Sequence, residues 1–280
     1  MEQLLIFDQP LTSAKLFCRY PGAKLIAAKH LAKFIPKDVN QIVSPFIGGG
    51  SFELFLTCRN IRVYGYDKFE PLVHCWNYAL KDAVKLSDWC YSILPKITKE
   101  NLSEIWKNQF KDLSEFETAG YFWLLCALSW NGAPIRGLYD FIIKENQAWQ
   151  STKNGYVKPK IDWKRLREFS NNLISVKCLD FEEALERHPD MFTYCDPPYP
   201  GVGNMYGNNK EYHSEFDHER LMKCLSKRKT DWLLSYNNQP LIQELYPQSE
   251  YNWKFQPWRK TKTHYGNPIG TEVLISPKIR

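Results

Sequence analysis

The chain has 280 residues, which is enough for one large domain or for a core domain with a smaller insert. Its 44% apolar and 24% charged residues exclude a chain that is disordered or fibrous throughout. Lys and Arg outnumber Asp and Glu by 37 to 31, and the resulting formal charge of +6 permits a polyanionic partner without requiring one.

The first third of the chain alternates strand and helix patterns. Residues 24–35 place their apolar side chains on one face of a helix. Residues 41–43 then predict a buried strand, 51–56 a helix and 62–66 a second strand, after which a long helix begins. This order of strand, helix, strand and helix predicts a parallel α/β sheet.

The middle of the chain has a different character. Little strand signal is present between residues 86 and 160. Residues 114–117 form a capping box that opens an apolar helix over 118–129. Residues 146–164 are polar and predict a loop. We interpret this region as an inserted, mainly helical module.

Sheet signals resume after the insert. Strands are predicted over 174–178, 191–195, 232–235, 251–256 and 272–276, and helices over 181–187, 217–228 and 239–245. The prediction is therefore a two-part catalytic domain (1–85 and 161–280) that carries an insert (86–160).

A glycine turn follows the first predicted strand. Gly48, Gly49 and Gly50 separate that strand from a helix, which lets a ligand approach the backbone closely. Asp67 ends the next strand, about 20 residues after Gly48, where nucleotide-binding α/β folds carry an acid for ribose hydroxyls. The pattern lacks the spacing of a pyrophosphate-binding turn, so it favours an adenosine-type ligand, with a purely structural turn as the alternative.

The second chemical signal is Asp196-Pro197-Pro198-Tyr199, directly after a predicted strand. The exocyclic amine of a base is a poor nucleophile because its lone pair is delocalised into the ring. An acid and a backbone carbonyl that each accept one N–H would localise that lone pair, and an aromatic ring would stack on the base. Asp196 and the Pro197 carbonyl suit the acceptor role, Pro198 stiffens the turn, and Tyr199 suits stacking.

An ordered set of motifs resembles the Dam-type (D12 class) DNA adenine-N6 methyltransferases. The matching segments are Arg19-Tyr20-Pro21-Gly22-Ala23-Lys24, Pro45-Phe46-Ile47-Gly48-Gly49-Gly50-Ser51, Tyr64-Gly65-Tyr66-Asp67, Trp130-Asn131-Gly132 and Tyr194-Cys195-Asp196-Pro197-Pro198-Tyr199. Residues 234–237 and 259–275 resemble the family's C-terminal part more loosely. The resemblance implies a Rossmann-like, S-adenosylmethionine-dependent methyltransferase sheet with an inserted target-recognition domain.

The resemblance also implies site residues. S-adenosylmethionine would be the methyl donor and S-adenosylhomocysteine the product, with no metal. Tyr20 and Lys24 would line the methionine end of the cofactor pocket, and Asp67 would bind the ribose. The remaining implied cofactor contacts are Pro45, Phe46, Gly48, Gly50, Asp180 and Phe181, the last two at the cofactor adenine.

The insert would recognise double-stranded DNA. The resemblance implies that Trp130 and Asn131 begin a segment that probes the duplex, with Trp130 as a wedge. Arg136 would contact a guanine edge. Arg136 lies one place later than the family's arginine, so GATC specificity does not follow. Ser44 also departs from the family, which commonly has an acid before Pro45.

Location and partners follow from what the chain lacks. Its longest dense apolar stretch, 121–130, is about half of what a bilayer requires, and we detect no signal peptide. The eight cysteines include no C-x-x-C pair. We expect a cytoplasmic enzyme, on a bacterial nucleoid or in the host cell of a virus, that is a monomer or weak dimer and acts without a membrane. A cognate restriction endonuclease is a candidate partner.

Three alternative functions remain open at this point. The nearest is the same chemistry on cytosine N4 or on adenine in RNA. Another is a nicotinamide-dependent oxidoreductase that uses the glycine turn but gives Asp196 no role. The last is a DNA-binding relative without catalysis.

Overall fold

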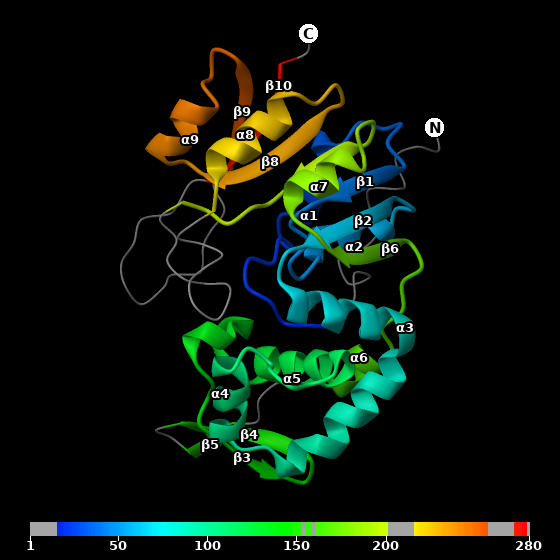
Figure 1. The fold of residues 1–280 in the computed structure, drawn as a ribbon, viewed down its shortest axis with the longest axis vertical. Helices are drawn as coiled ribbons and strands as arrows, with labels where there is room; N and C mark the ends of the chain where they lie inside the picture. Colours follow the sequence, from blue (N-terminus) through cyan, green and yellow to red (C-terminus); the bar gives the residue numbers. More distant parts are fainter. Residues whose placement is uncertain (1–15, 153–154, 158–160, 201–215, 257–271, 279–280) are drawn as a thin grey trace.

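A seven-stranded sheet in the order β6-β2-β1-β7-β8-β10-β9 forms the upper part of the molecule in the view of Figure 1. The computed structural model describes residues 16–152, 155–157, 161–200, 216–256 and 272–278. Strands β6, β2, β1, β7 and β8 are parallel, whereas β10 pairs antiparallel with both β8 and β9. The strand bounds are β1 (Gln41–Ser44), β2 (Arg62–Asp67), β6 (Ile174–Cys178), β7 (Phe192–Cys195), β8 (Trp232–Asn237), β9 (Tyr251–Gln256) and β10 (Glu272–Pro277). The predicted α/β class with a mostly parallel sheet is confirmed.

Helices cover both faces of this sheet, and the side chains of the strands divide between two cores. On β8, Leu233 joins the core under α1, α2 and α3, whereas Trp232 and Leu234 join the core under α7, α8 and α9. This alternation is the period of two that a strand buried on both faces requires. The helix bounds are α1 (Ala28–Leu31), α2 (Ser51–Thr57), α3 (Glu70–Ile93), α7 (Phe181–Glu186), α8 (His218–Ser226) and α9 (Pro240–Leu245).

The first helix is shorter than the predicted 24–35. It comprises α1 and a 3-10 turn over Ala32–Phe34. The backbone N–H of Lys24 donates to the side-chain oxygen of Ser51 at 2.6 Å, so the chain before α1 is bonded to the start of α2. A tertiary hydrogen bond therefore replaces the first turn of the helix that the apolar pattern predicts.

Helix α3 carries the chain from the sheet into the middle region, and it bends at Asp82, where the backbone is not helical (Figure 1). Beyond a 3-10 turn (Leu94–Lys96), α5 (Glu115–Leu128) packs beside α3, and α4 (Lys99–Lys107) packs against α5. Ser114 and Glu117 cap α5 reciprocally, with the Glu117 N–H donating to the Ser114 hydroxyl at 3.3 Å and the Ser114 N–H to Glu117 at 3.0 Å. The predicted capping box is confirmed.

A second, three-stranded antiparallel sheet occupies part of the middle region, where the sequence predicts loops and helices. Its strands are β3 (Phe141–Lys144), β4 (Gln147–Thr152) and β5 (Gly155–Val157), and the short helix α6 (Trp163–Arg167) follows. The loop predicted over 146–164 is therefore wrong. Glu145 and Asn146 join β3 to β4 with φ of 49° and 53°, the two positive values of a tight hairpin turn.

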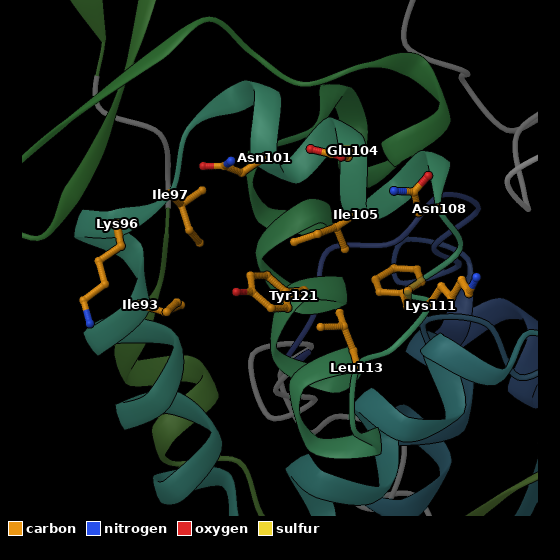
Figure 2. Close-up of a pocket in the computed structure, with 11 residues that line it drawn as sticks. Ile93, Lys96, Ile97, Asn101, Glu104, Ile105, Asn108, Lys111, Leu113 and Tyr121 are labelled. Carbon is orange, nitrogen blue, oxygen red and sulfur yellow. The ribbon is translucent and has the colours of Figure 1, made fainter.

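A cavity of about 360 Å³ opens between the end of α3, α4 and α5 (Figure 2). Ile97, Ile105 and Tyr121 contribute apolar surface, and Lys96 and Glu104 contribute charge at its rim. The cavity lies in the middle region, and none of the site residues predicted from the sequence lines it. Among the described residues, no helix combines the length and the apolar character that a membrane crossing demands.

Candidate active site at the switch point of the sheet

The order of the strands reverses between β1 and β7. The chain builds β2 and β6 on one side of β1, and then β7 and β8 on the other. In open α/β sheets the crevice at such a point, beyond the carboxyl ends of the strands, is where ligands bind. The loop after β1 holds the glycine turn and the loop after β7 begins with Asp196. The fold therefore brings the two predicted motifs together at the carboxyl ends of neighbouring strands.

The glycine turn is packed tightly by two aromatic side chains. Gly48 and Gly50 have φ of +50° and +61°, in the left-handed region that favours glycine. A Cβ on Gly49 would lie 2.8 Å from the Cβ of Tyr20, and one on Gly50 would lie 2.5 Å from the ring of Trp76. The Trp76 indole N–H also donates to the Gly48 carbonyl at 2.8 Å. Tyr20 therefore lies against the turn, and its predicted place in a cofactor pocket stays a prediction.

Asp67 is bonded to this turn from the end of β2. Its carboxylate accepts from the backbone N–H of Gly48 and of Phe69, both at 3.0 Å. Burial raises the pKa of Asp67 to about 6, and these backbone donors oppose the shift. The carboxylate thus fixes the loop after β1, and its predicted ribose contact stays a prediction.

Asp196 emerges from a fully buried strand into a polar cluster. Its Oδ2 lies 2.8 Å from the Lys24 ammonium, and its Oδ1 lies 2.8 Å from the Tyr199 hydroxyl. Burial raises the pKa of Asp196, and the Lys24 charge lowers it. Pro197 is buried beside it. The predicted catalytic acid is therefore adjacent to the predicted cofactor residue Lys24, although the two are far apart in the sequence.

Tyr199 takes part through its hydroxyl group. That oxygen lies 3.0 Å from the Lys24 ammonium and 2.9 Å from the Ser235 hydroxyl, and its ring lies 5.7 Å from the ring of Tyr236. Burial, reinforced by Asp196 and Glu272, raises the pKa of the phenol well above its ordinary value, so Tyr199 is neutral. The stacking role predicted for its ring stays a prediction.

Two polar residues of the cluster were missed by the sequence reasoning. Ser235 of β8 and Glu272 of β10 are both buried, and the Ser235 hydroxyl donates to Glu272 Oε1. Glu272 Oε1 also lies 2.8 Å from the Tyr199 hydroxyl and 3.3 Å from the Lys24 ammonium. A usable signal existed, since each is a polar residue inside an otherwise apolar strand pattern.

Glu53 and Tyr194 were missed as well. Glu53, on α2, is only 3% exposed, and its carboxylate accepts from the Ser44 hydroxyl at 2.7 Å. Burial raises the pKa of Glu53 to about 7, with the Ser44 hydrogen bond opposing the shift. The buried hydroxyl of Tyr194 has no hydrogen-bond partner among the described residues. An unpaired buried hydroxyl beside these acids points to a place where a ligand completes the hydrogen bonding.

Asp180 and Phe181 lie at the start of α7, as the site prediction requires. Asp180 caps the helix by accepting from the Glu182 N–H at 3.0 Å, and its Oδ2 pairs with Arg220 at 2.8 Å. The Phe181 ring lies 5.5 Å from that of Phe46, which follows β1. The two predicted cofactor aromatics are therefore in contact.

The residues predicted to meet DNA form a separate exposed loop. Trp130 is 50% exposed and its ring lies 4.5 Å from that of Tyr139, while Asn131 and Arg136 are exposed. A Cβ on Gly132 would lie 2.8 Å from the backbone of Arg19. The loop is thus packed against the N-terminal segment that leads to Tyr20 and Lys24.

Chemically, the site combines hydrogen-bond acceptors with one cation. No group of three or more His, Cys, Asp or Glu in the described part of the chain is arranged to hold a metal ion. Asp196 and Glu272 share the Lys24 ammonium. Such a site can accept N–H donors and can attract a positively charged ligand.

Comparison with known proteins identifies the family. Residues 20–261 match the family described as D12 class N6 adenine-specific DNA methyltransferase. The chain is also similar to the Type II methyltransferase M1.LlaDCHI of Lactococcus lactis subsp. cremoris, with 26% identity over 250 residues that cover 82% of this chain and 84% of that protein. The match spans the glycine turn, the loop at Trp130 and the acid after β7, so the chain belongs to the D12 class of N6 adenine-specific DNA methyltransferases.

Proposed function

We propose that this protein transfers a methyl group from S-adenosylmethionine to N6 of an adenine that is extruded from duplex DNA at a specific site. The observation that carries the proposal is the Asp196 carboxylate at the switch point, only 18% exposed and followed at once by two prolines and Tyr199. Membership of the family supports adenine methylation in DNA. The geometry supports the acceptor role of Asp196.

The residues at the strand ends fit S-adenosylmethionine. The unpaired Tyr194 hydroxyl and the surplus of carboxylates over ammonium suit a ligand that is cationic at sulfur. Tyr20, Lys24, Pro45, Phe46, Gly48, Gly50 and Asp67 would hold it along the loops after β1 and β2, with Asp180 and Phe181 at its adenine end. When bound, S-adenosylmethionine supplies a methyl group on positively charged sulfur and becomes S-adenosylhomocysteine.

Asp196 would orient the target amine. One N–H of adenine N6 donates to Asp196 and the other to the Pro197 carbonyl, which directs the nitrogen lone pair at the methyl carbon. Tyr199 would stack on the base and hold it outside the duplex, where unstacking costs a few kcal/mol. The nitrogen–methyl bond forms as the methyl–sulfur bond breaks, and the extra proton on N6 leaves to solvent.

The middle region would choose the DNA site. In this proposal residues 1–85 and 161–280 form the catalytic domain, and residues 86–160 form the target-recognition insert. Trp130 and Asn131 would probe the duplex, and Arg136 would contact a guanine edge. The exposure of these three side chains on one packed loop supports this assignment.

A direct test compares Asp196→Asn with Asp190→Asn, a matched change on an exposed acid. N6-methyladenine is measured by nucleoside mass spectrometry after incubation with duplex DNA and S-adenosylmethionine. We expect Asp196→Asn to lose about hundredfold or more of the rate, because the amine loses its charged acceptor. Full activity of Asp196→Asn would overturn the mechanism, and the absence of N6-methyladenine with the unaltered protein would overturn the function.

The same assay separates the alternative functions. Formation of N4-methylcytosine would favour cytosine N4 as the methyl acceptor. Formation of N6-methyladenine only in RNA would favour adenine in RNA as the acceptor. Stabilisation against heat by NAD but not by S-adenosylhomocysteine would favour an oxidoreductase. Mapping the modified bases in DNA from cells that express the chain would give its recognition sequence, and a nuclease that cuts the same unmodified sequence would be its restriction partner.

A further inference from the structure

Glu272 is a buried carboxylate that the proposed mechanism does not use. It begins β10, where it lies opposite Asn237 of β8 and Gln256 of β9. Only 7% of the residue is exposed, and the next residues of the strand, Val273, Leu274 and Ile275, are apolar and buried. A charged group at such a position is costly unless it is paired. The groups that pair with the Glu272 carboxylate therefore indicate what this charge does in the fold.

The side-chain partners of Glu272 among the described residues belong to the candidate catalytic cluster, which comprises Lys24, Asp196, Tyr199, Ser235 and Glu272. Its Oε1 lies 2.8 Å from the Tyr199 hydroxyl and 3.3 Å from the Lys24 ammonium, and it accepts the Ser235 hydroxyl. Lys24 and Tyr199 are also the two groups that engage Asp196, through Oδ2 and Oδ1 respectively. The two carboxylates thus compete for the same two donors.

The shared donors matter because, in the proposed mechanism, the adenine amine must also donate a hydrogen bond to Asp196. Both oxygens of Asp196 are engaged, one by the Lys24 ammonium and one by the Tyr199 hydroxyl. A phenol has one proton, so Tyr199 donates to either Asp196 or Glu272 but not to both. Each carboxylate oxygen can accept more than one hydrogen bond, but an arriving N–H donor must share its oxygen with one of these groups and so weakens or displaces that bond. The displaced donor would be left buried and unpaired unless a second acceptor lay within reach.

We propose that Glu272 is a positioning residue that takes over the Lys24 ammonium and the Tyr199 hydroxyl when the adenine amine binds to Asp196. This inference rests on the proposed adenine methylation. Glu272 would act through Lys24 and Tyr199 and would not touch the base itself. Exchange of acceptors requires only small movements, because Oε1 already lies within 3.3 Å of both donors.

The test compares Glu272→Gln with Glu244→Gln, which makes the same change on an exposed residue of α9. Steady-state methylation of a duplex with one target adenine gives kcat and KM. We expect Glu272→Gln to lower kcat roughly tenfold to hundredfold, because the neutral amide holds the ammonium weakly and Asp196 stays occupied. The KM for the duplex should change less than about threefold, since the DNA-binding loop is untouched.

A pH profile distinguishes positioning from a general loss of structure. Among the described residues, the charged and titratable groups that face Asp196 are Lys24 from the N-terminal segment, Glu53 from α2, Tyr194 and Cys195 from β7, Tyr199 from the loop after β7, Tyr236 from β8 and Glu272 from β10. Glu272 raises the pKa of Asp196, so its neutralisation should lower that pKa. The acid limb of kcat/KM should move to lower pH in Glu272→Gln, while Glu244→Gln should match the unaltered protein.

The outcomes separate the two proposals. If the unaltered protein methylates DNA and Glu272→Gln matches it in kcat and acid limb, the role of Glu272 is overturned and the proposed function stands. If the unaltered protein forms no N6-methyladenine, both fall. If Glu272→Gln does not fold, Glu272→Asp replaces it. That variant keeps the charge with a shorter reach, so an intermediate kcat supports the role, and an unchanged kcat overturns it.

Discussion

Lys24 supplies the positive charge on which the acids of the catalytic cluster depend. Its ammonium lies 2.8 Å from Asp196 and 3.3 Å from Glu272, while its own backbone N–H is bonded to Ser51. The side chain is therefore fixed at both ends, between the start of α2 and the loop after β7. A flexible surface lysine could not hold two buried carboxylates in this way.

Replacing this charge should change the pH dependence of methylation in a defined direction. Lys24 lowers the pKa of Asp196, so Lys24→Met should raise that pKa and move the acid limb of kcat/KM to higher pH. The shift is opposite in sign to the one expected for Glu272→Gln. Methylation rates between pH 5 and 9 measure it, with the exposed Lys33→Met as control. An acid limb that stays in place would show that Asp196 does not titrate in the reaction.

The buried carboxyl group of Glu53 leads to a second prediction, which concerns the free energy of unfolding. Burial raises its pKa from 4.5 to about 7 in the folded protein, so the folded state binds this proton more tightly than the unfolded chain does. The associated stabilisation is present below pH 4.5 and is lost as the pH rises through 7. A shift of this size corresponds to about 3 kcal/mol.

Glu53→Gln removes that titration. Its free energy of unfolding, relative to the unaltered protein, should therefore rise by up to about 3 kcal/mol between pH 5 and pH 8.5. Denaturant unfolding at the two pH values measures the difference, and Glu244→Gln on the surface serves as the control. Parallel pH dependence of Glu53→Gln and the unaltered protein would contradict the assignment.

At the scale of elements, the glycine turn between β1 and α2 depends on space as well as on backbone conformation. Gly50 and Gly137 both have positive φ, of +61° and +85°. A Cβ on Gly50 would meet the Trp76 ring at 2.5 Å, whereas one on Gly137 would meet none of the described atoms within 4 Å. Gly50 therefore combines backbone strain with overpacking, whereas Gly137 has backbone strain alone.

Gly50→Ala should cost more stability than Gly137→Ala. Gly50→Ala bears the strain of a side chain in the left-handed region, about 1–2 kcal/mol, whereas Gly137, with φ of 85° and ψ of 161°, lies in a region that is essentially restricted to glycine, where the strain is about 1–3 kcal/mol. Gly50→Ala should lose about 1–3 kcal/mol in addition, because Trp76 is fully buried and cannot move aside. Chemical denaturation of the two variants gives both values. Equal losses would mean that α3 shifts to make room.

The sequence predicted those helices and strands whose apolar residues recur with a regular period. The strands around the switch point and the capped helix α5 are confirmed, because apolar runs and a capping box report local structure directly. The hairpin at Glu145–Asn146 was missed, since neither residue is glycine and its positive φ values leave no strong signal. The contacts of Ser235 and Glu272 with Tyr199 were also missed, because pairing between distant strands is a tertiary property.

For the whole molecule, the candidate chemistry and the candidate DNA loop lie on different parts of the fold. The candidate catalytic cluster lies beyond the carboxyl ends of the central strands of the large sheet, whereas Trp130 and Arg136 follow α5. We therefore expect the removal of an exposed side chain of this loop, such as that of Trp130, to affect DNA without affecting the cofactor. Trp130 is half exposed, so its removal should cost little stability.

Trp130→Ala provides the test. Methylation of duplex DNA should fall roughly tenfold or more, because the wedge that replaces the extruded base is lost. Binding of S-adenosylhomocysteine, measured by calorimetry, should stay within about twofold, since the loops after β1 and β2 are unchanged. Leu241→Ala, on an exposed apolar residue of α9, is the control. A parallel loss of cofactor binding would contradict the separation of the two surfaces.

The close contact between Gly132 and the backbone of Arg19 has a consequence for mutational scanning. A side chain at position 132 would push the Arg19 carbonyl, which lies 2.8 Å from where its Cβ would be. Arg19 leads directly into Tyr20 and Lys24, so the disturbance would reach the ammonium beside Asp196. A scan would then score Gly132 as a catalytic position although it lies in the candidate DNA loop, and unchanged binding of duplex DNA by the variant would reveal the error.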